Sequence, residues 1–110
     1  MIGGNITATF QKYTSYKNEI GENVREWSDV LQKKGFLDYK SGGADYDYSA
    51  KLQDSTHLFM CDYFDYKTLK LAPETARMLI DGEIYDIMMI DDPMGLHQHL
   101  EIHLEYLGGQ

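Results

Sequence analysis

The sequence of 110 residues contains a single cysteine, Cys61, so no disulfide can form within the chain. Cys61 lies in the mostly apolar run Leu58 to Phe64, and no basic residue directly flanks it to lower the pKa of its thiol. A small buried cysteine that packs as an apolar side chain is therefore the prediction.

Long apolar runs are also missing. None approaches the roughly 20 residues needed to cross a bilayer. The segment Met1 to Asn5 lacks the charged and apolar regions of a secretory signal. We therefore expect a soluble, cytoplasmic protein that makes no membrane contact.

Basic residues are scarce: 10 lysines and arginines stand against 18 aspartates and glutamates, a net charge of -8. Residues 71–110 hold eight acidic residues and one basic residue, Arg77, whereas residues 1–70 hold ten acidic and nine basic ones. Such a surface repels phosphate, which argues against nucleic-acid binding through a basic patch. It is compatible with a surface along which nucleic acid passes without sticking.

The last third of the chain predicts three antiparallel strands in one domain spanning residues 1–110. Asp81-Gly82 separates two apolar runs and supplies the positive backbone angles of a two-residue type I′ hairpin. The strand that follows, Glu83 to Ile90, is apolar on both alternating faces, which predicts a central strand covered on both sides. Asp91 to Gly95 then forms a turn, because Pro93 cannot donate a ladder hydrogen bond.

The third of these strands begins near Leu96 and alternates cleanly. One predicted face holds Leu96, Leu100, Ile102, Leu104 and Tyr106, and the other holds His97, His99, Glu101, His103 and Glu105. Alternate histidines on a strand can reach one metal ion if a neighbouring strand adds a ligand. A polar face opposite a buried apolar face is the favoured interpretation, and no metal is expected. A small metal-binding β-barrel protein or enzyme that uses His97, His99 and His103 is the alternative.

The earlier part of the chain also favours strands. Val24 to Lys34 fits either a helix or a strand, and we favour strands at Arg25 to Val30 and Gly35 to Lys40 with a kink between them. Further segments are predicted as a strand at Ile6 to Tyr13, a turn at Thr14 to Gly21, a strand at Thr56 to Tyr63 and an irregular connection at Asp65 to Thr75 with one helical turn after Pro73. The fold prediction is mainly β: a small antiparallel β-barrel or sandwich of about six strands with a long loop near residues 41–55.

That loop shows the least regular pattern in the sequence. Loops longer than about 12 residues are unusual in compact domains and are often functional. Gly42-Gly43 could act as a hinge, and a surface excursion or a short helix over Ala50 to Asp54 is equally compatible. The candidate functional residues are Ser41, Gly42, Gly43, Ala44, Asp45, Tyr46, Asp47, Tyr48, Ser49, Ala50, Lys51, Leu52, Gln53, Asp54 and Ser55.

Catalytic signatures are missing from the sequence. It has no Gly-rich phosphate loop, no Gly-x-Ser-x-Gly elbow and no nucleophile with an obvious base, so neither an enzyme nor a cofactor is expected. Asp91-Asp92 fits a turn better than a Mg²⁺ site. Nine tyrosines are more than one small core would absorb, and tyrosine is favoured at protein interfaces. Assembly with other proteins is therefore the more plausible role.

These features resemble the head-closure proteins of long-tailed phages and prophages, also called head-tail joining or stopper proteins. The resemblance covers most of the chain. It rests on the Trp27 segment leading to Gly35-Phe-Leu-Asp-Tyr-Lys-Ser-Gly42, on Thr56 to Tyr63, on Arg77 to Gly82 and Tyr85-Asp-Ile, on Asp91-Asp-Pro-Met, and on His99-Leu-Glu-Ile.

The resemblance implies a structural virion protein at the head-tail connector, present in the host cytoplasm during assembly. Copies would form a homo-oligomeric ring that closes the DNA-filled head and docks the tail. The implied partners are a connector adaptor protein and a tail-completion or tail-tube protein, with phage DNA passing through without specific binding. By position, residues 41–55 resemble the loop that projects toward the channel and helps to plug it.

Overall fold

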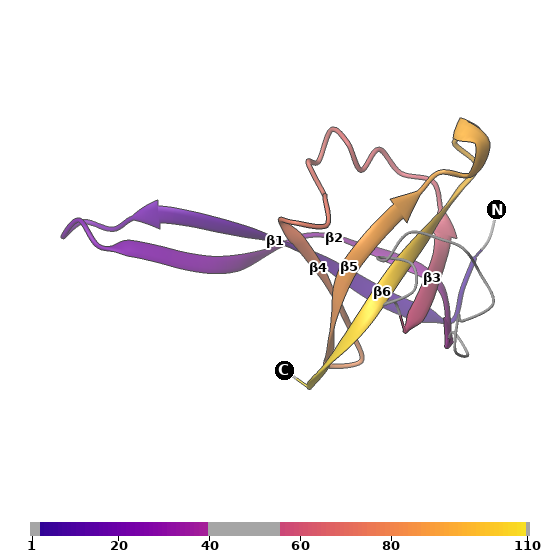
Figure 1. Cartoon of the computed structure of the whole chain (residues 1–110), viewed down its shortest axis with the longest axis horizontal. Helices are drawn as coiled ribbons and strands as arrows, with labels where there is room; N and C mark the ends of the chain where they lie inside the picture. Colours follow the sequence, from indigo (N-terminus) through magenta and orange to yellow (C-terminus); the bar gives the residue numbers. More distant parts are fainter. Residues whose placement is uncertain (1–2, 40–55, 110) are drawn as a thin grey trace.

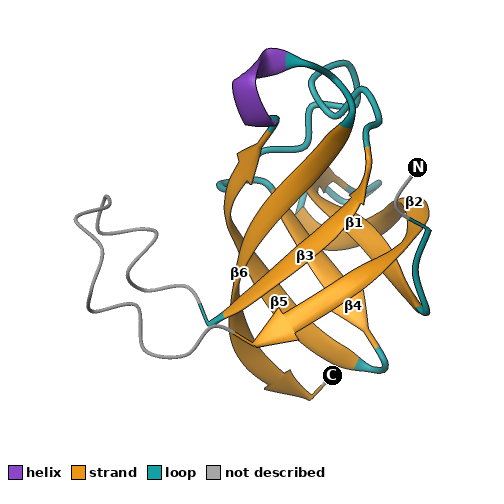
Figure 2. Cartoon of the chain, turned by 90° about the vertical axis from the view of Figure 1, so that its right-hand side faces the viewer, coloured by secondary structure: helices purple, strands orange, loops and turns teal. Residues whose placement is uncertain are grey.

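In the computed structural model, which describes residues 3–39 and 56–109, six antiparallel strands form one sheet (Figures 1 and 2). The strands are β1 (Ile6–Lys17), β2 (Asn23–Tyr39), β3 (His57–Asp62), β4 (Ala76–Ile80), β5 (Glu83–Asp91) and β6 (His99–Gly109), with a short 3₁₀ turn, η1 (Pro93–Gly95), before β6. The mainly β prediction is confirmed. The candidate loop residues 41–55, with the helix considered over 50–54, lie outside the described residues.

The strand order β1-β2-β3-β6-β5-β4 closes into a barrel, because β1 pairs with β2 on one side and with β4 on the other. Closure gives the sheet one inner face. The core consists of Leu71, from the connection between β3 and β4, and of side chains on this inner face: Ala8, Phe10, Phe59, Cys61, Ala76, Met78, Ile80, Tyr85, Ile87, Leu100, Ile102 and Leu104. Within this core the rings of Phe10 and Phe59 pack edge to face, with their centroids 6.5 Å apart.

The β4-β5 hairpin forms as predicted. Asp81 and Gly82 both have positive φ, 51° and 76°, and the flanking residues Ile80 and Glu83 pair across the turn. Glycine tolerates this backbone region without strain. The local sequence therefore fixes this connection.

A second glycine is required by a close approach between strands. Gly35 on β2 faces Cys61 on β3, and a Cβ atom there would collide with the Met60 carbonyl oxygen and lie 2.6 Å from Phe59 Cζ. Only a residue without a side chain lets β2 pass this close to the core.

The prediction that β5 is covered on both faces is wrong. Tyr85 and Ile87 are buried, but Met88, Met89 and Ile90 are only half-buried, and of these three Ile90 packs against the core. A register shift between Ile87 and Met89 interrupts the pairing with β6. A closed barrel buries only its inner face, so the outer apolar residues of β5 lie on the surface.

The alternation of β6 is confirmed in its middle and wrong at its ends. Leu100, Ile102 and Leu104 are fully buried, whereas Leu96 and Tyr106 are 57% and 44% exposed. The strand begins at His99, not near Leu96, because His97 has a positive φ of 56° that turns the chain before the ladder starts.

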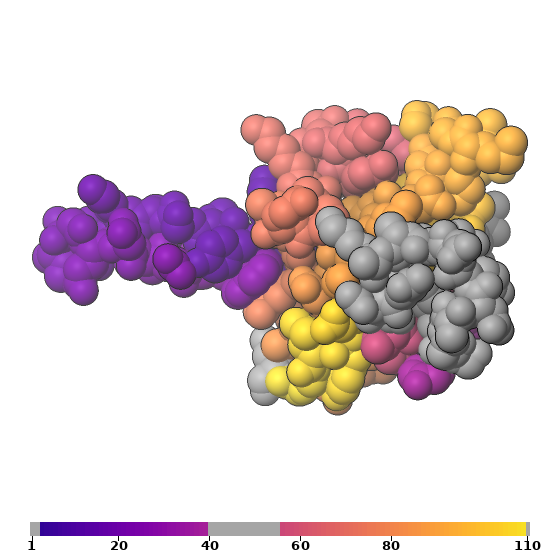
Figure 3. All heavy atoms as spheres, viewed as in Figure 1, coloured from indigo at the N-terminus to yellow at the C-terminus, as the bar shows by residue number. Residues whose placement is uncertain are grey.

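The β1-β2 hairpin is longer than predicted and leaves the barrel. β1 pairs with β4 only from Ala8 to Lys12, yet its pairing with β2 continues to Lys17↔Asn23. Residues 13–28, here called the arm, form the narrow projection seen in Figures 1 and 3. The first half of the predicted turn, Thr14 to Lys17, is therefore strand, and only Asn18 to Gly21 form the turn. The helix considered for Val24 to Lys34 is wrong. The two strands predicted on either side of a kink are one continuous strand, β2, whose pairing with β1 is interrupted only by a bulge at Val30.

Candidate functional site

The histidine row does not form a common metal site. His97 lies outside β6, where its Nδ1 is paired with Asp92 Oδ2 and its ring lies 4.4 Å from the Tyr63 ring. His99 Nε2 lies 3.0 Å from Glu101 Oε2 on the outer face of β6. In residues 3–39 and 56–109, no three histidine, cysteine or acidic side chains gather closely enough to hold a metal ion.

The acidic candidates shape turns. Asp92 Oδ1 accepts a hydrogen bond from the His97 amide at 3.0 Å, which orders the connection between β5 and β6. Asp65 accepts one from the Thr68 hydroxyl at 2.6 Å, and this bond lowers the pKa of the Asp65 carboxyl. The interpretation of Asp91-Asp92 as part of a turn agrees with the geometry at Asp92.

Cys61 is fully buried, as predicted from the sequence. Burial raises the pKa of its thiol to about 11, because the apolar core disfavours the thiolate. At neutral pH the side chain is a neutral apolar group and a poor nucleophile.

Aromatic side chains gather around His57, near the start of β3. The His57 ring lies 5.3 Å from Tyr39, 5.2 Å from Tyr85 and 6.1 Å from Tyr106. Burial lowers the pKa of His57, so the neutral imidazole is favoured within this group. Tyr106 donates its hydroxyl to Glu83 Oε2 at 2.8 Å, and that bond raises the pKa of Tyr106. Tyr39, His57, Tyr85 and Tyr106 form the aromatic cluster.

Hydrogen bonds add to the anchoring of this end of the barrel. The Thr56 amide donates to the Leu104 carbonyl at 2.7 Å, and the Thr56 hydroxyl accepts from the Tyr106 amide at 2.8 Å. Thr56, the first described residue after the candidate loop, is therefore hydrogen-bonded to β6.

The arm is joined to the barrel by a clasp of five residues. Arg77 on β4 places its guanidinium 4.2 Å from the Trp27 ring centroid and donates to Gln11 Oε1 at 2.8 Å. Gln11, buried at 8% exposure, in turn donates to Asp29 Oδ1 at 2.8 Å. Tyr13 packs edge-on against Trp27, with ring centroids 5.2 Å apart. These contacts fix the direction in which the arm leaves the barrel.

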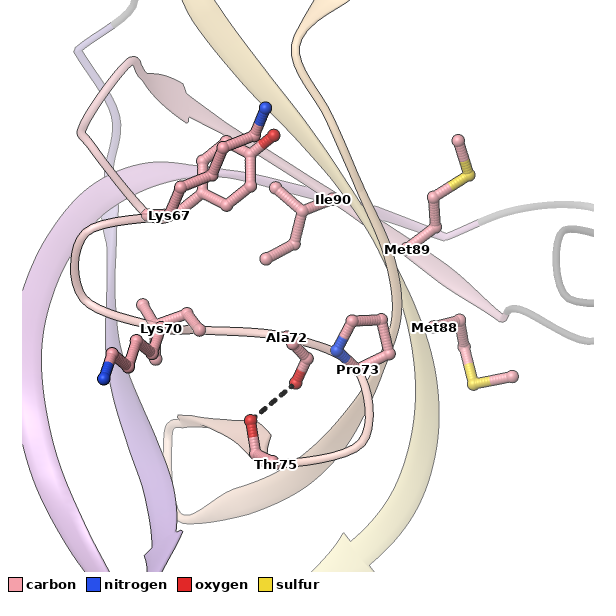
Figure 4. A pocket seen from close by; sticks show the side chains of 10 residues that line it. Lys67, Lys70, Ala72, Pro73, Thr75, Met88, Met89 and Ile90 are labelled. Atoms are coloured by element: carbon pink, nitrogen blue, oxygen red, sulfur yellow. Dashed lines mark hydrogen bonds between the residues drawn. The ribbon is translucent and has the colours of Figure 1, made fainter.

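An apolar groove of about 630 Å³ lies between the irregular connection after β3 and the outer face of β5. Figure 4 shows Lys67 and Lys70 on one side of the groove and Met88 and Met89 on the other. Its lining residues are Tyr66, Lys67, Lys70, Leu71, Ala72, Pro73, Thr75, Met88, Met89 and Ile90. The groove exists because the outer apolar residues of β5 are left partly uncovered.

The arm and the groove were not found from the sequence. The signal for the arm was the run of strand-compatible residues after Tyr13. Because this run is polar, the sequence favoured a turn there. The signal for the groove was Met88 to Ile90, whose apolar character predicted burial. In both cases the pairing partners of a strand decide which side chains reach solvent.

The described part of the chain contains no helix long and apolar enough to span a membrane. No curated protein matches the sequence. A family model described as phage head completion protein matches residues 5–106. This range includes the whole arm and every strand of the barrel except for the last three residues of β6. The chain therefore belongs to the phage head completion protein family.

Proposed function

We propose that this phage head-closure protein forms a ring at the head-tail connector, where it closes the DNA-filled head and docks the tail. The single observation that carries the proposal is the family match over residues 5–106. A structural role agrees with the contacts of Asp65 and Asp92, whose carboxylates accept hydrogen bonds that stabilise turns.

The charge distribution supports a position beside DNA. A ring whose lumen presents the acidic residues of the C-terminal third would repel passing DNA across a Debye length of about 8 Å. Exposed tyrosines suit contacts with neighbouring subunits, and Tyr16 and Tyr39 are 49% and 75% exposed. The proposed partners are an adaptor on the head side and a tail-completion or tail-tube protein on the tail side.

We further propose that residues 41–55 act at the channel as a plug. The aromatic cluster and the Thr56 hydrogen bonds hold Tyr39 and Thr56, the described residues on either side of this segment, against the barrel. A plug must resist pressure from packaged DNA, which requires a rigid base.

Gene deletion and complementation test the role in the particle. Without the protein we expect DNA-filled heads that leak DNA and lack tails, and the wild-type chain should restore infectious particles. A mutant with a normal yield of tailed, infectious particles would contradict the proposed function. Sizing the purified protein alone and with its adaptor ring tests ring formation.

Replacing residues 43–53 with a Gly/Ser linker of equal length tests the plug separately. We expect the variant to join heads and tails but to lose DNA from heads before tails attach. Normal DNA retention in tail-less heads would remove the plug from the proposal and leave head closure by the ring intact.

A further inference from the structure

The tip of the arm exposes an apolar side chain between two acidic ones. Ile20 is 78% exposed, and Glu19 and Glu22 flank it within the turn that joins β1 to β2. Neither glutamate forms an ion pair with another described residue. Lys17, just before the turn, lies opposite Asn23 in the ladder and places one positive charge at the base of the tip. The tip therefore presents one apolar group and two free negative charges.

This tip is ordered before any partner arrives. The Asn18 carboxamide oxygen accepts hydrogen bonds from the amides of Ile20 at 3.1 Å and Glu22 at 2.9 Å. The Gly21 amide donates to the Asn18 carbonyl at 3.0 Å. A preformed turn loses little conformational entropy when it binds.

The groove has complementary chemistry. Met88, Met89 and Ile90 supply an apolar wall, and methionine adapts readily to the shape of an incoming side chain. Lys67 and Lys70 supply two positive charges at its edge in a chain whose net charge is -8. Neither lysine is in an ion pair with any residue of the described segments.

The tip and the groove of one molecule are held apart. Figures 1 and 3 show the arm leading straight away from the barrel, and the clasp at Arg77 and Trp27 fixes its base. The longest axis of the molecule is 51 Å, against 30 and 26 Å for the other two. The tip therefore reaches outward toward another molecule.

We propose that the arm tip of one copy docks into the groove of a second copy, with Ile20 against the Met88-Met89 wall and Glu19 and Glu22 facing Lys67 and Lys70. This inference rests on the proposed ring. Because the two surfaces differ, the contact is head-to-tail, and such contacts repeat around a ring when the rotation closes. One small tip makes a weak contact on its own, and a closed ring strengthens it by making the last contacts intramolecular.

A cysteine pair tests the contact in assembled particles. Ile20→Cys and Met89→Cys are placed together in the chain that supplies the virion, and particles are oxidised and run on a non-reducing gel. We expect a ladder of disulfide-linked copies. The matched control replaces Ile20→Cys with Ser15→Cys, an exposed position along the arm, and should give no ladder. The native Cys61 is buried and should not take part.

The outcomes separate this inference from the proposed function. Incorporation of the pair variant into particles without a ladder would overturn the arm contact and leave the structural role standing. A disulfide-linked adduct with a different virion protein would contradict the proposal that a second copy of this chain occupies the groove. If the wild-type chain is not found in normal particles, the proposed function and the arm contact both fail.

A charge exchange gives an independent readout. Glu19→Lys with Glu22→Lys, and separately Lys67→Glu with Lys70→Glu, should each lower the yield of infectious particles by about tenfold or more. All four changes in one chain should restore most of the yield, because every contact then has its charges reversed together. Failure of the fourfold variant to recover, while urea denaturation shows that it folds, would contradict the proposed contact.

Discussion

Strands β1 and β2 run through both the barrel and the arm, but the two regions depend on different interactions. In the barrel, β1 has a partner on each side and buries Ala8 and Phe10 completely. In the arm, the same strand has one partner, and the residues from Thr14 to Lys17 are exposed. The barrel therefore contributes most of the free energy of folding. The arm offers exposed side chains that can contact other molecules.

The largest expected effect is in the barrel core. Phe59→Ala should lower the free energy of unfolding by about 3 to 5 kcal/mol, because it removes a fully buried ring and leaves a cavity. Urea denaturation followed by circular dichroism measures this. Phe36→Ala, on the neighbouring strand but 42% exposed, is the control and should cost much less. Equal losses would contradict the assignment of stability to the inner face.

Overpacking at the strand crossing comes next. Gly35→Ala should cost about 1 to 3 kcal/mol, because the new Cβ would collide with the Met60 carbonyl and the Phe59 ring. Gly109→Ala is the matched control, since the nearest atom to its added Cβ is Glu83 Oε2 at 3.7 Å. The same denaturation experiment applies, and a neutral Gly35→Ala would show that β2 can shift away from the core.

The clasp joins the two regions and should give an intermediate effect. Arg77→Met removes the contact with Trp27 and leaves Gln11 Oε1 without its donor, at a cost of about 1 to 2 kcal/mol. Hydrogen exchange should become faster in the arm than in β6. The control Arg25→Met, at an exposed position of the arm, should leave both rates unchanged. Uniformly faster exchange in both regions would contradict a local clasp.

Alkaline pH should weaken the barrel through its buried thiol. The pKa of Cys61 is raised from 9.0 to about 11, so the unfolded chain releases this proton at lower pH than the folded chain. The stabilisation is complete below pH 9.0 and is lost as pH rises toward 11. Cys61→Ala should flatten this part of the curve of unfolding free energy against pH. The pKa values of Tyr85 and Tyr106 are also raised, and their contribution to the pH dependence should be the same in the wild type and in Cys61→Ala.

The smallest effect on stability is expected at the arm tip. Ile20→Ser should change the free energy of unfolding by no more than about 0.5 kcal/mol, because Ile20 is 78% exposed. The same variant should lose assembly if the tip docks into a second copy. A substantial loss of stability in the isolated chain would instead place Ile20 in a fold-stabilising contact.

Much of the barrel was predictable because its signals are local. Asp81-Gly82 specifies a tight turn by backbone sterics alone, and Leu100, Ile102 and Leu104 mark a buried face by their spacing of two. The candidate site was less predictable. The histidines at 97, 99 and 103 share a spacing, but a turn at His97 removes it from the strand face.

The sequence by itself determined the mainly β class, the β4-β5 hairpin, the burial of Cys61 and the acidic net charge. Each follows from neighbouring residues or from composition. Only the tertiary structure decided that β1 pairs with β4, that the β1-β2 hairpin continues past the barrel as an arm, and that Met88 and Met89 line a groove. These features depend on which distant strands pair and in what register. An alternating pattern of side chains specifies a strand, but it does not specify the partner of that strand.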